Sequence, residues 1–506
     1  MLRLFGVTGL DRAGRPLAGT AVDRWLASAR DGLAGGIALP FAMALLEYDL
    51  EPQQLALDVA SGAIDLALEA ELLRERDRRE LAVAEATRLV GAAVERVDAD
   101  RVARRELLAL LGEADRPWIG TTISEPDVDE ALDEAAELAA AGYDLLRVEV
   151  PIGRELAARM EAAGEDVPEW QPGARSRGSA AARSAAVSTP ELEGGDPAPS
   201  GSQRALARLR RAADGVAAQR RGYVRLGTAI PPLGVPEGAV VASFERVDMV
   251  EADPVEEIVV GGVDPDRSLA DHAFARRLHR RADTYVSIGP GPLVVAPDLA
   301  SGLPSDPATR SGRALALQLL GVALAQADGL VADRLVVGAY PDWLADEPSA
   351  TARMLAEVSL RRSLFPDHLI RFDEPVGHRE RTTLAWPFVV AAALARVGSA
   401  AVIMRRVGAG AAAIHEARAA ARTSADLAAV ADPAKLHGVA DDHATAMLAA
   451  AATTLERLSD RGWRAVVGDQ PRGPARSAEG RSRPIGGDAV AERTETFDPL
   501  AGFDPG

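Results

Sequence analysis

The spacing of apolar and polar positions changes character near Pro117. Before it, apolar side chains recur three or four positions apart, as in amphipathic helices. The clearest helical runs are residues 21–30, 36–50, 52–73 and 73–97. We therefore predict an all-helical N-terminal region over residues 1–115.

After Pro117, short apolar runs rich in β-branched residues alternate with helical patterns such as 127–142 and 268–282. Eight strands are predicted, at WIGTTI (118–123), LLRVEV (145–150), YVRLGTAI (223–230), VDMVEAD (247–253), TYVSIG (284–289), RLVVGAY (334–340), LIRFDEP (369–375) and AAVIMRR (400–406). Strands that alternate with helices indicate a parallel sheet. Eight such units predict a TIM (β/α)8 barrel. EIVVGG (257–262) is a ninth candidate strand, so a doubly wound open sheet is the alternative.

The barrel domain is expected to cover residues 116–425. Inside it, residues 157–201 lose their periodicity and become rich in Ser, Gly, Pro and Ala, which predicts a flexible insertion. Residues 426–506 are expected to form a C-terminal helix followed by an extended tail rich in Pro, Gly and Arg.

Composition excludes several kinds of partner and of chemistry for this protein. The 506 residues carry a net charge of −18, which argues against nucleic acid or an anionic membrane as a partner. Because the sequence holds no cysteine, disulfides and thiolate chemistry are excluded. No stretch approaches the length of an apolar transmembrane segment, and the N-terminus lacks the apolar core of a signal peptide. We expect a cytoplasmic protein.

A single lysine, Lys435, limits covalent chemistry. Any Schiff base formed by this chain could use only that residue. Lys435 is predicted to lie between helical segments, as an exposed surface residue. Schiff-base chemistry would therefore need a lysine from a partner chain.

Familiar catalytic motifs are missing. The sequence contains no phosphate-binding P-loop, no GxGxxG after a strand, no HExxH and no GxSxG. Seven histidines are scattered without metal-ligand spacing, so no metal site is predicted. His378 follows the seventh strand and either faces the barrel mouth or lies in a solvated loop.

Acidic residues recur where the predicted strands end: Glu251, Asp253, Asp342, Asp373 and Glu374. On a barrel they would ring the mouth and suit a cationic substrate or Mg²⁺, unless they are ordinary charges of acidic loops.

Arg371 lies inside an apolar strand and needs a partner. A substrate carboxylate or phosphate is one possibility. An internal ion pair with one of the acids is the other.

Several segments resemble one family. They are LRLFGVTGLD near the N-terminus, YVRLGTAIPPLGVPEGAVVASFERVD (223–248), VDPDRSLADHAF (263–274) and SLFPDHLIRFDEP (363–375). Together they are similar, in the same order, to the α subunit of lysine 5,6-aminomutase, which acts on D-lysine or β-lysine. The resemblance covers most of the chain outside 157–201 and about 290–310.

The resemblance implies a TIM-barrel subunit that pairs with a smaller β subunit. That β subunit would carry the DxHxxG cobalamin motif and the lysine that binds pyridoxal 5′-phosphate. With adenosylcobalamin, the pair would move the terminal amino group of lysine or β-lysine to the adjacent carbon, an isomerase reaction. The missing DxHxxG and the single lysine are expected of an α subunit.

The resemblance also implies where the cofactor should lie, and there this sequence departs from the family. The arginine at the end of the second strand becomes Val150, and a serine just beyond it becomes Glu155. A serine after the third strand becomes Pro231. The tyrosine that stacks on the pyridine ring becomes Glu256, and the phosphate-binding arginine becomes Gly261.

Losing two arginines removes donors to the cofactor phosphate. Backbone N–H groups near Gly262, or the side chains of Arg225 or Arg267, are candidate replacements.

For the substrate, Arg371 matches the family's carboxylate-binding lysine. The substrate-binding aspartate falls at Asp298 or at Gly291. No catalytic residue of this chain is identified.

Two alternatives to the aminomutase subunit remain. One is a catalytically degenerate paralogue that keeps the barrel as a binding or partner subunit. The other is a cofactor-independent barrel enzyme that uses the acidic mouth.

Overall fold

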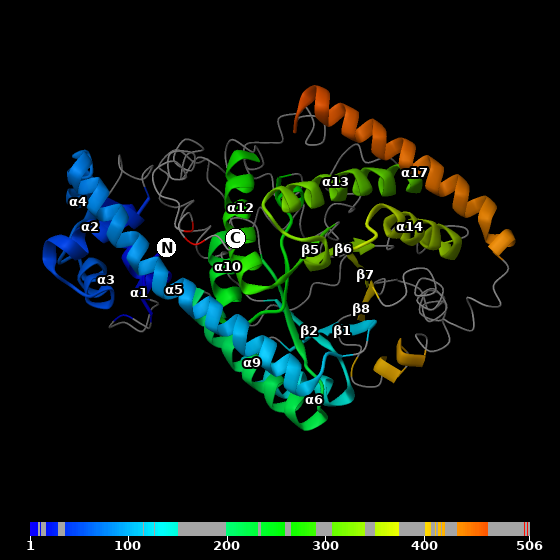
Figure 1. Ribbon diagram of the computed structural model, residues 1–506, viewed down its shortest axis with the longest axis horizontal. Helices are drawn as coiled ribbons and strands as arrows, with labels where there is room; N and C mark the ends of the chain where they lie inside the picture. Colours follow the sequence, from blue (N-terminus) through cyan, green and yellow to red (C-terminus); the bar gives the residue numbers. More distant parts are fainter. Residues whose placement is uncertain are drawn as a thin grey trace.

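Eight parallel strands form a closed barrel in the computed structural model (Figure 1). The structure describes residues 1–8, 11, 17–28, 36–114, 116–125, 127–149, 199–230, 234–258, 265–289, 306–339, 350–373, 400–405, 410, 413–415, 417–419, 433–463, 500 and 503. The strands are β1 (Trp118–Thr122), β2 (Leu145–Glu149), β3 (Arg225–Ala229), β4 (Met249–Glu251), β5 (Tyr285–Ile288), β6 (Leu335–Ala339), β7 (Leu369–Asp373) and β8 (Ala401–Arg405).

The predicted TIM barrel is confirmed. Each of the eight predicted runs contains one strand, and neighbours in sequence pair in register around the ring. Pairing of β1 with β8, in which Trp118 lies opposite Val402, closes the barrel. The open-sheet alternative is therefore wrong. In the ninth candidate run, residues 257 and 258 are helical, and residues 259–262 lie outside the described residues.

The helices that cover the barrel come from the N-terminal region, from between the strands and from the C-terminal part of the chain. The N-terminal set is α1 (Leu17–Ser28), α2 (Ala38–Tyr48), α3 (Pro52–Ser61), α4 (Leu66–Leu72) and α5 (Arg76–Leu111). It gathers on one side of the molecule, drawn in blue in Figure 1. The predicted run 52–73 is divided because Gly62 takes a left-handed φ of 79° after α3. Asp65 then caps α4 by accepting a bond from the Ala67 amide.

The remaining helices surround the strands: α6 (Val128–Ala141), α9 (Pro199–Arg220), α10 (Val235–Phe244), α11 (Pro254–Glu256), α12 (Pro265–Ala282), α13 (Pro307–Ala327), α14 (Ala350–Leu364) and α17 (Pro433–Arg461). None of the described helices is both long enough and apolar enough to cross a membrane.

Helix α10 is not among the predicted helical patterns, because Gly238 weakens its helical signal. Gly238 is needed for close packing: a Cβ there would lie 2.5 Å from Cγ2 of Ile230.

The long helix α17, orange in Figure 1, lies along α13 and α14. Gly312 of α13 allows this close approach, since a Cβ there would lie 2.4 Å from the Met447 carbonyl oxygen. Lys435 lies in the first turn of α17. The prediction that it lies between helical segments is therefore wrong.

The barrel interior is apolar toward the amino ends of the strands. Its buried side chains are Trp118, Leu145, Met249, Val336, Leu369, Val402 and Met404. Gly120 makes room for this filling, because a Cβ there would lie 2.5 Å from Sδ of Met404. Further along the strands, toward their carboxyl ends, the interior becomes charged.

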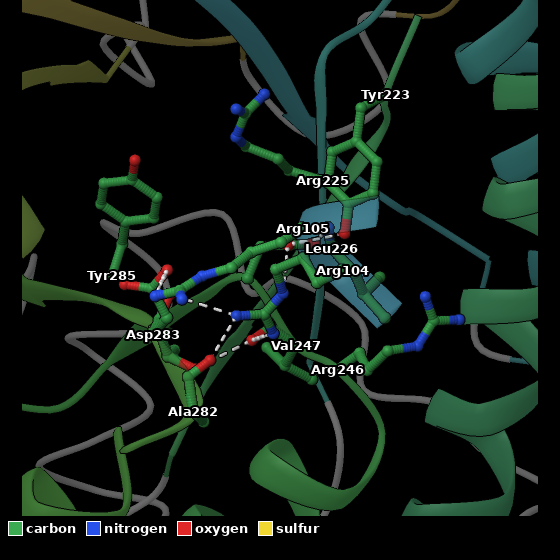
Figure 2. Close-up of polar contacts among 12 residues, drawn as sticks. Arg104, Arg105, Tyr223, Arg225, Leu226, Arg246, Val247, Ala282, Asp283 and Tyr285 are labelled. Atoms are coloured by element: carbon green, nitrogen blue, oxygen red, sulfur yellow. Dashed lines mark hydrogen bonds and ion pairs between the residues drawn. The ribbon is translucent and has the colours of Figure 1, made fainter. Parts of the chain in front are cut away.

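One arginine of α5 fastens the N-terminal region to the foot of the barrel (Figure 2). Arg104 donates to the carbonyls of Ala282 (2.6 Å), Asp283 (3.1 Å) and Val247 (3.0 Å). Its Nε also lies 3.2 Å from Oδ1 of Asp248. The helix thus donates to backbone acceptors that lie just before β4 and β5.

Candidate functional site

Six polar side chains meet where β2, β4, β5 and β7 end: Arg147, Glu149, Glu251, Ser287, Arg371 and Asp373. Two strands contribute the same local pattern, LLRVE in β2 and LIRFD in β7, with an arginine two positions before an acid. Because alternate residues of a strand face the same side, each arginine and its acid both point to the interior. We call these six residues the mouth network.

Glu251 lies between the two arginines. Its Oε1 is 2.8 Å from Nε of Arg147 and 2.7 Å from Nη1 of Arg371, and its Oε2 accepts from Nη2 of Arg147 at 3.1 Å. Burial alone would raise the pKa of Glu251, but Arg147 and Arg371 hold it below its usual value. Glu251 is therefore an ionised carboxylate shared by two cations.

The remaining donors of Arg371 are also engaged. Nη1 donates to the Ser287 hydroxyl at 3.0 Å, and both Nε and Nη2 lie 3.0 Å from Oδ2 of Asp373. The side chain of Arg371 is only 8% exposed. The structure thus contains the internal ion pair that was one of the two predicted explanations for this arginine.

Asp373 lies at the rim of the mouth network. Burial raises its pKa above the usual value, Arg371 opposes that shift, and the charge of Glu251 adds to it. A carboxyl of this kind takes up a proton more readily than an ordinary surface aspartate.

The sequence analysis did not single out Arg147. Its signal was present, since an arginine between Leu146 and Val148 in a buried strand needs a partner as much as Arg371 does. Nη2 of Arg147 lies 3.0 Å from Oε1 of Glu149, and its side chain is 15% exposed. Its Nη1 makes no hydrogen bond to a described residue.

Arg225, one of the candidate replacements for the phosphate-binding arginines, lies elsewhere. It begins β3, at the opposite end of the barrel from the mouth network. Its guanidinium carbon lies 3.6 Å from the centre of the Trp118 ring, and its Nη2 donates to Glu113 at 2.7 Å. The side chain is 3% exposed, and burial lowers its pKa. This placement removes Arg225 from the candidates for binding a phosphate at the mouth.

Other predicted residues fall in three groups. Asp253 caps α11 by accepting from the Val255 amide at 2.9 Å. Glu256 ends α11 and Arg267 lies in the first turn of α12, and for both only the backbone is described. Outside the described residues lie Val150, Glu155, Pro231, Gly261, Gly262, Gly291, Asp298, Asp342, Glu374 and His378.

A second buried polar cluster links α11 to α12. Glu257 accepts from Oγ of Ser268 at 2.5 Å, and Nε2 of His272 lies 3.1 Å from the same oxygen. Each of these side chains is almost completely buried. Among the described residues no group of three His, Cys, Asp or Glu side chains could hold a metal ion.

Comparison with known proteins gives one consistent family. The profile described as "D-Lysine 5,6-aminomutase TIM-barrel domain of alpha subunit" matches residues 1–157 and 195–386. The lysine 5,6-aminomutase alpha subunit of Fusobacterium nucleatum is 24% identical over 375 residues. That of Acetoanaerobium sticklandii is 23% identical over the same length. Each alignment covers 74% of this chain and 64% of the relative, so the chain spans less than two thirds of these relatives.

Among solved structures, a dihydropteroate synthase from Yersinia pestis covers 61% of this chain and 95% of its own. Its identity of 12% and TM-score of 0.35 are too low to support any inference. The family match, in contrast, takes in the N-terminal helices and seven of the eight strands. The chain belongs to the D-lysine 5,6-aminomutase alpha-subunit family, of which it carries the TIM-barrel domain.

Proposed function

We propose that this chain is the barrel subunit of an aminomutase that uses adenosylcobalamin and pyridoxal phosphate. The reaction would shift the terminal amino group of lysine or β-lysine to the adjacent carbon. Membership of the aminomutase family is the observation that carries this proposal. Both relatives named above are lysine 5,6-aminomutase alpha subunits, which supports the choice of substrate.

A second, smaller subunit is part of the proposal. The name alpha subunit implies a partner in the relatives. This sequence itself offers a single lysine and no DxHxxG motif. Lys435 lies in the first turn of α17, which packs on α13 and α14 in the outer layer of helices. The partner would therefore supply both the Schiff-base lysine and the DxHxxG cobalamin motif.

The described residues do not by themselves fit the phosphate of pyridoxal phosphate. Such a phosphate needs several N–H donors, from arginines or from backbone amides. Arg371 is engaged by Glu251, Ser287 and Asp373, and Arg225 lies at the other end of the barrel. Arg267 and the backbone near Gly262 stay as candidates for this role.

In this proposal the mouth network receives the amino acid itself. Arg371 keeps a positive charge at the position of the family's carboxylate-binding lysine, and Asp298 is a candidate for the family's substrate-binding aspartate. An amino acid carries both signs of charge, and so does the mouth network.

A non-catalytic binding subunit is the second candidate. The internal pairing of Arg371 favours it, as do Pro231, Glu256 and Gly261 at positions where the resembled family holds its cofactor.

Co-purification with a small partner chain separates the two. The partner to co-purify is the product of a neighbouring gene that encodes a DxHxxG motif and a Schiff-base lysine. Adding pyridoxal phosphate should produce imine absorbance, and adding adenosylcobalamin with lysine or β-lysine should produce the shifted diamino acid. An assembled complex that shows neither absorbance nor product would rule out the aminomutase and leave the binding subunit.

A further inference from the structure

The mouth network distributes its hydrogen-bond donors unevenly. Arg371 has five N–H groups, of which Nε, Nη1 and Nη2 direct four toward Asp373, Glu251 and Ser287. A substrate carboxylate could reach Arg371 only by displacing Asp373 or Glu251. Removing a partner from a buried charge is unfavourable, so Arg371 is poorly placed to bind a ligand directly.

Arg147 is placed differently. It holds Glu251 through Nε and Nη2, and that same Nη2 reaches Glu149. Its Nη1 makes no hydrogen bond to a described residue, and its Nε, 2.8 Å from Oε1 of Glu251, contributes an ion pair without a hydrogen bond. At 15% exposure the side chain is also more accessible than that of Arg371, at 8%.

The acids of the rim have open acceptors. Asp373 uses only Oδ2 for Arg371, and Glu149 uses only Oε1 for Arg147, within the part of the chain that the structure describes. These side chains are 18% and 25% exposed. The free carboxylate oxygens of Glu149 and Asp373 therefore lie on the same rim as Nη1 of Arg147. A ligand that carries both a carboxylate and an ammonium group needs such a donor and such acceptors side by side.

We propose that Arg147, and not Arg371, binds the substrate carboxylate, while Glu149 and Asp373 receive an ammonium group of the same molecule. Arg371 and Glu251 then act as positioning residues that hold the Arg147 guanidinium in place. This inference rests on the proposed function and deepens it, because it names the groups that select an amino acid.

A carboxylate suits this site better than a phosphate. A phosphate ester brings about two negative charges next to Glu149 and Asp373 and has no ammonium group to offset them. An amino acid brings one carboxylate together with its ammonium groups, so its charges match those of the rim.

Calorimetric titration of the full chain, with its partner subunit, tests the proposal. The probes are L-lysine, 1,5-diaminopentane (which lacks the carboxylate) and pyridoxal phosphate. Arg147→Gln should weaken lysine binding about ten- to a hundredfold, as for the loss of a charged hydrogen-bonded contact, and leave diaminopentane binding unchanged. Arg147→Lys should restore part of the lysine affinity.

If Arg147→Gln alone does not fold, the double variant Arg147→Gln with Glu251→Gln replaces it in the titration. The double variant removes one charge of each sign. Four outcomes would overturn the proposal. Arg147→Gln could leave lysine affinity unchanged, weaken diaminopentane binding equally, or weaken only pyridoxal phosphate binding. The unsubstituted complex could also fail to bind lysine.

Failure of the proposed function looks different from failure of this inference. If lysine binds through Arg147 but is not isomerised, the aminomutase activity is wrong and the binding role stands. If lysine is isomerised and Arg147→Gln leaves its KM unchanged, the activity stands and the role of Arg147 is wrong.

Discussion

Nε of Arg104 on α5 lies 3.2 Å from Oδ1 of Asp248, at the foot of β4, and both side chains are almost fully buried. The same aspartate accepts from Nη1 of Arg210 at 2.9 Å and from the Tyr223 hydroxyl at 2.8 Å. A helix of the N-terminal region, a helix of the barrel wall and two strands are therefore joined through a single carboxylate.

Arg104→Met should lower the free energy of unfolding by about 3–5 kcal/mol, because it leaves Asp248 and three carbonyls with fewer donors. Arg105→Met is the control, since Arg105 is 61% exposed and reaches Asp283 only at 3.5 Å. Urea unfolding of both variants measures the difference. Equal stability of the two variants would contradict the role of Arg104.

Gly312→Ala should destabilise the contact between α13 and α17, because the added Cβ would lie 2.4 Å from the Met447 carbonyl oxygen and 2.6 Å from Cβ of Ala450. Gly215→Ala, in α9, meets nothing within 4 Å and should stabilise its helix by up to about 1 kcal/mol. Thermal unfolding of the pair should move the midpoint in opposite directions. A rise in both would mean that α17 does not pack tightly on Gly312.

His279 should make the protein sensitive to acid. Its ring is buried with no hydrogen-bond partner among the described residues, next to His272 and Arg276. Burial first, then those two neighbours, lowers its pKa from 6.5 to about 3. The unfolded chain therefore binds a proton as pH falls through 6.5 while the folded protein does not, so stability is lost from that pH down to about 3.

His279→Leu should remove this loss. At pH 5 the contribution is about 2 kcal/mol, from about 1.4 kcal/mol per pH unit. Urea unfolding of the two proteins at pH 7.5 and pH 5 measures it. The His279→Leu protein should lose less stability between these pH values, and parallel losses would show that His279 is not the sensitive group.

Glu251→Ala should destabilise the mouth network by about 3–5 kcal/mol, since the guanidinium groups of Arg147 and Arg371 would lose the carboxylate they share. Glu149→Ala, at the more exposed rim, should cost less than about 1 kcal/mol. Denaturant unfolding distinguishes the two. If the two variants lose the same amount of stability, Glu251 is not the residue that holds the arginines.

The sequence predicted the barrel well because buried parallel strands and amphipathic helices each leave a local pattern. It missed α10, where Gly238 serves packing against Ile230 at the expense of helix propensity. It also offered both Arg225 and Arg371 as ligand-binding candidates, although Arg225 is the first residue of its strand and Arg371 is the third of its own. That difference decides which face of the barrel each arginine reaches.

The mouth network was predictable only in part. Arg371 and the acids at the strand ends are visible in the sequence, as is Arg147 in hindsight from the shared LLRVE and LIRFD pattern. Which carboxylate pairs with which arginine depends on how β2, β4 and β7 face one another across the closed barrel. No local spacing contains that information.

The contacts of Arg104 imply an order of assembly during synthesis. The three carbonyls and the carboxylate that receive it all belong to residues 247–283, whereas α5 ends at Leu111. The N-terminal helices therefore emerge from the ribosome long before their docking surface exists. They can dock through Arg104 only once synthesis has reached the start of the fifth strand. Residues 1–115 expressed alone would lack the surface on which α5 packs.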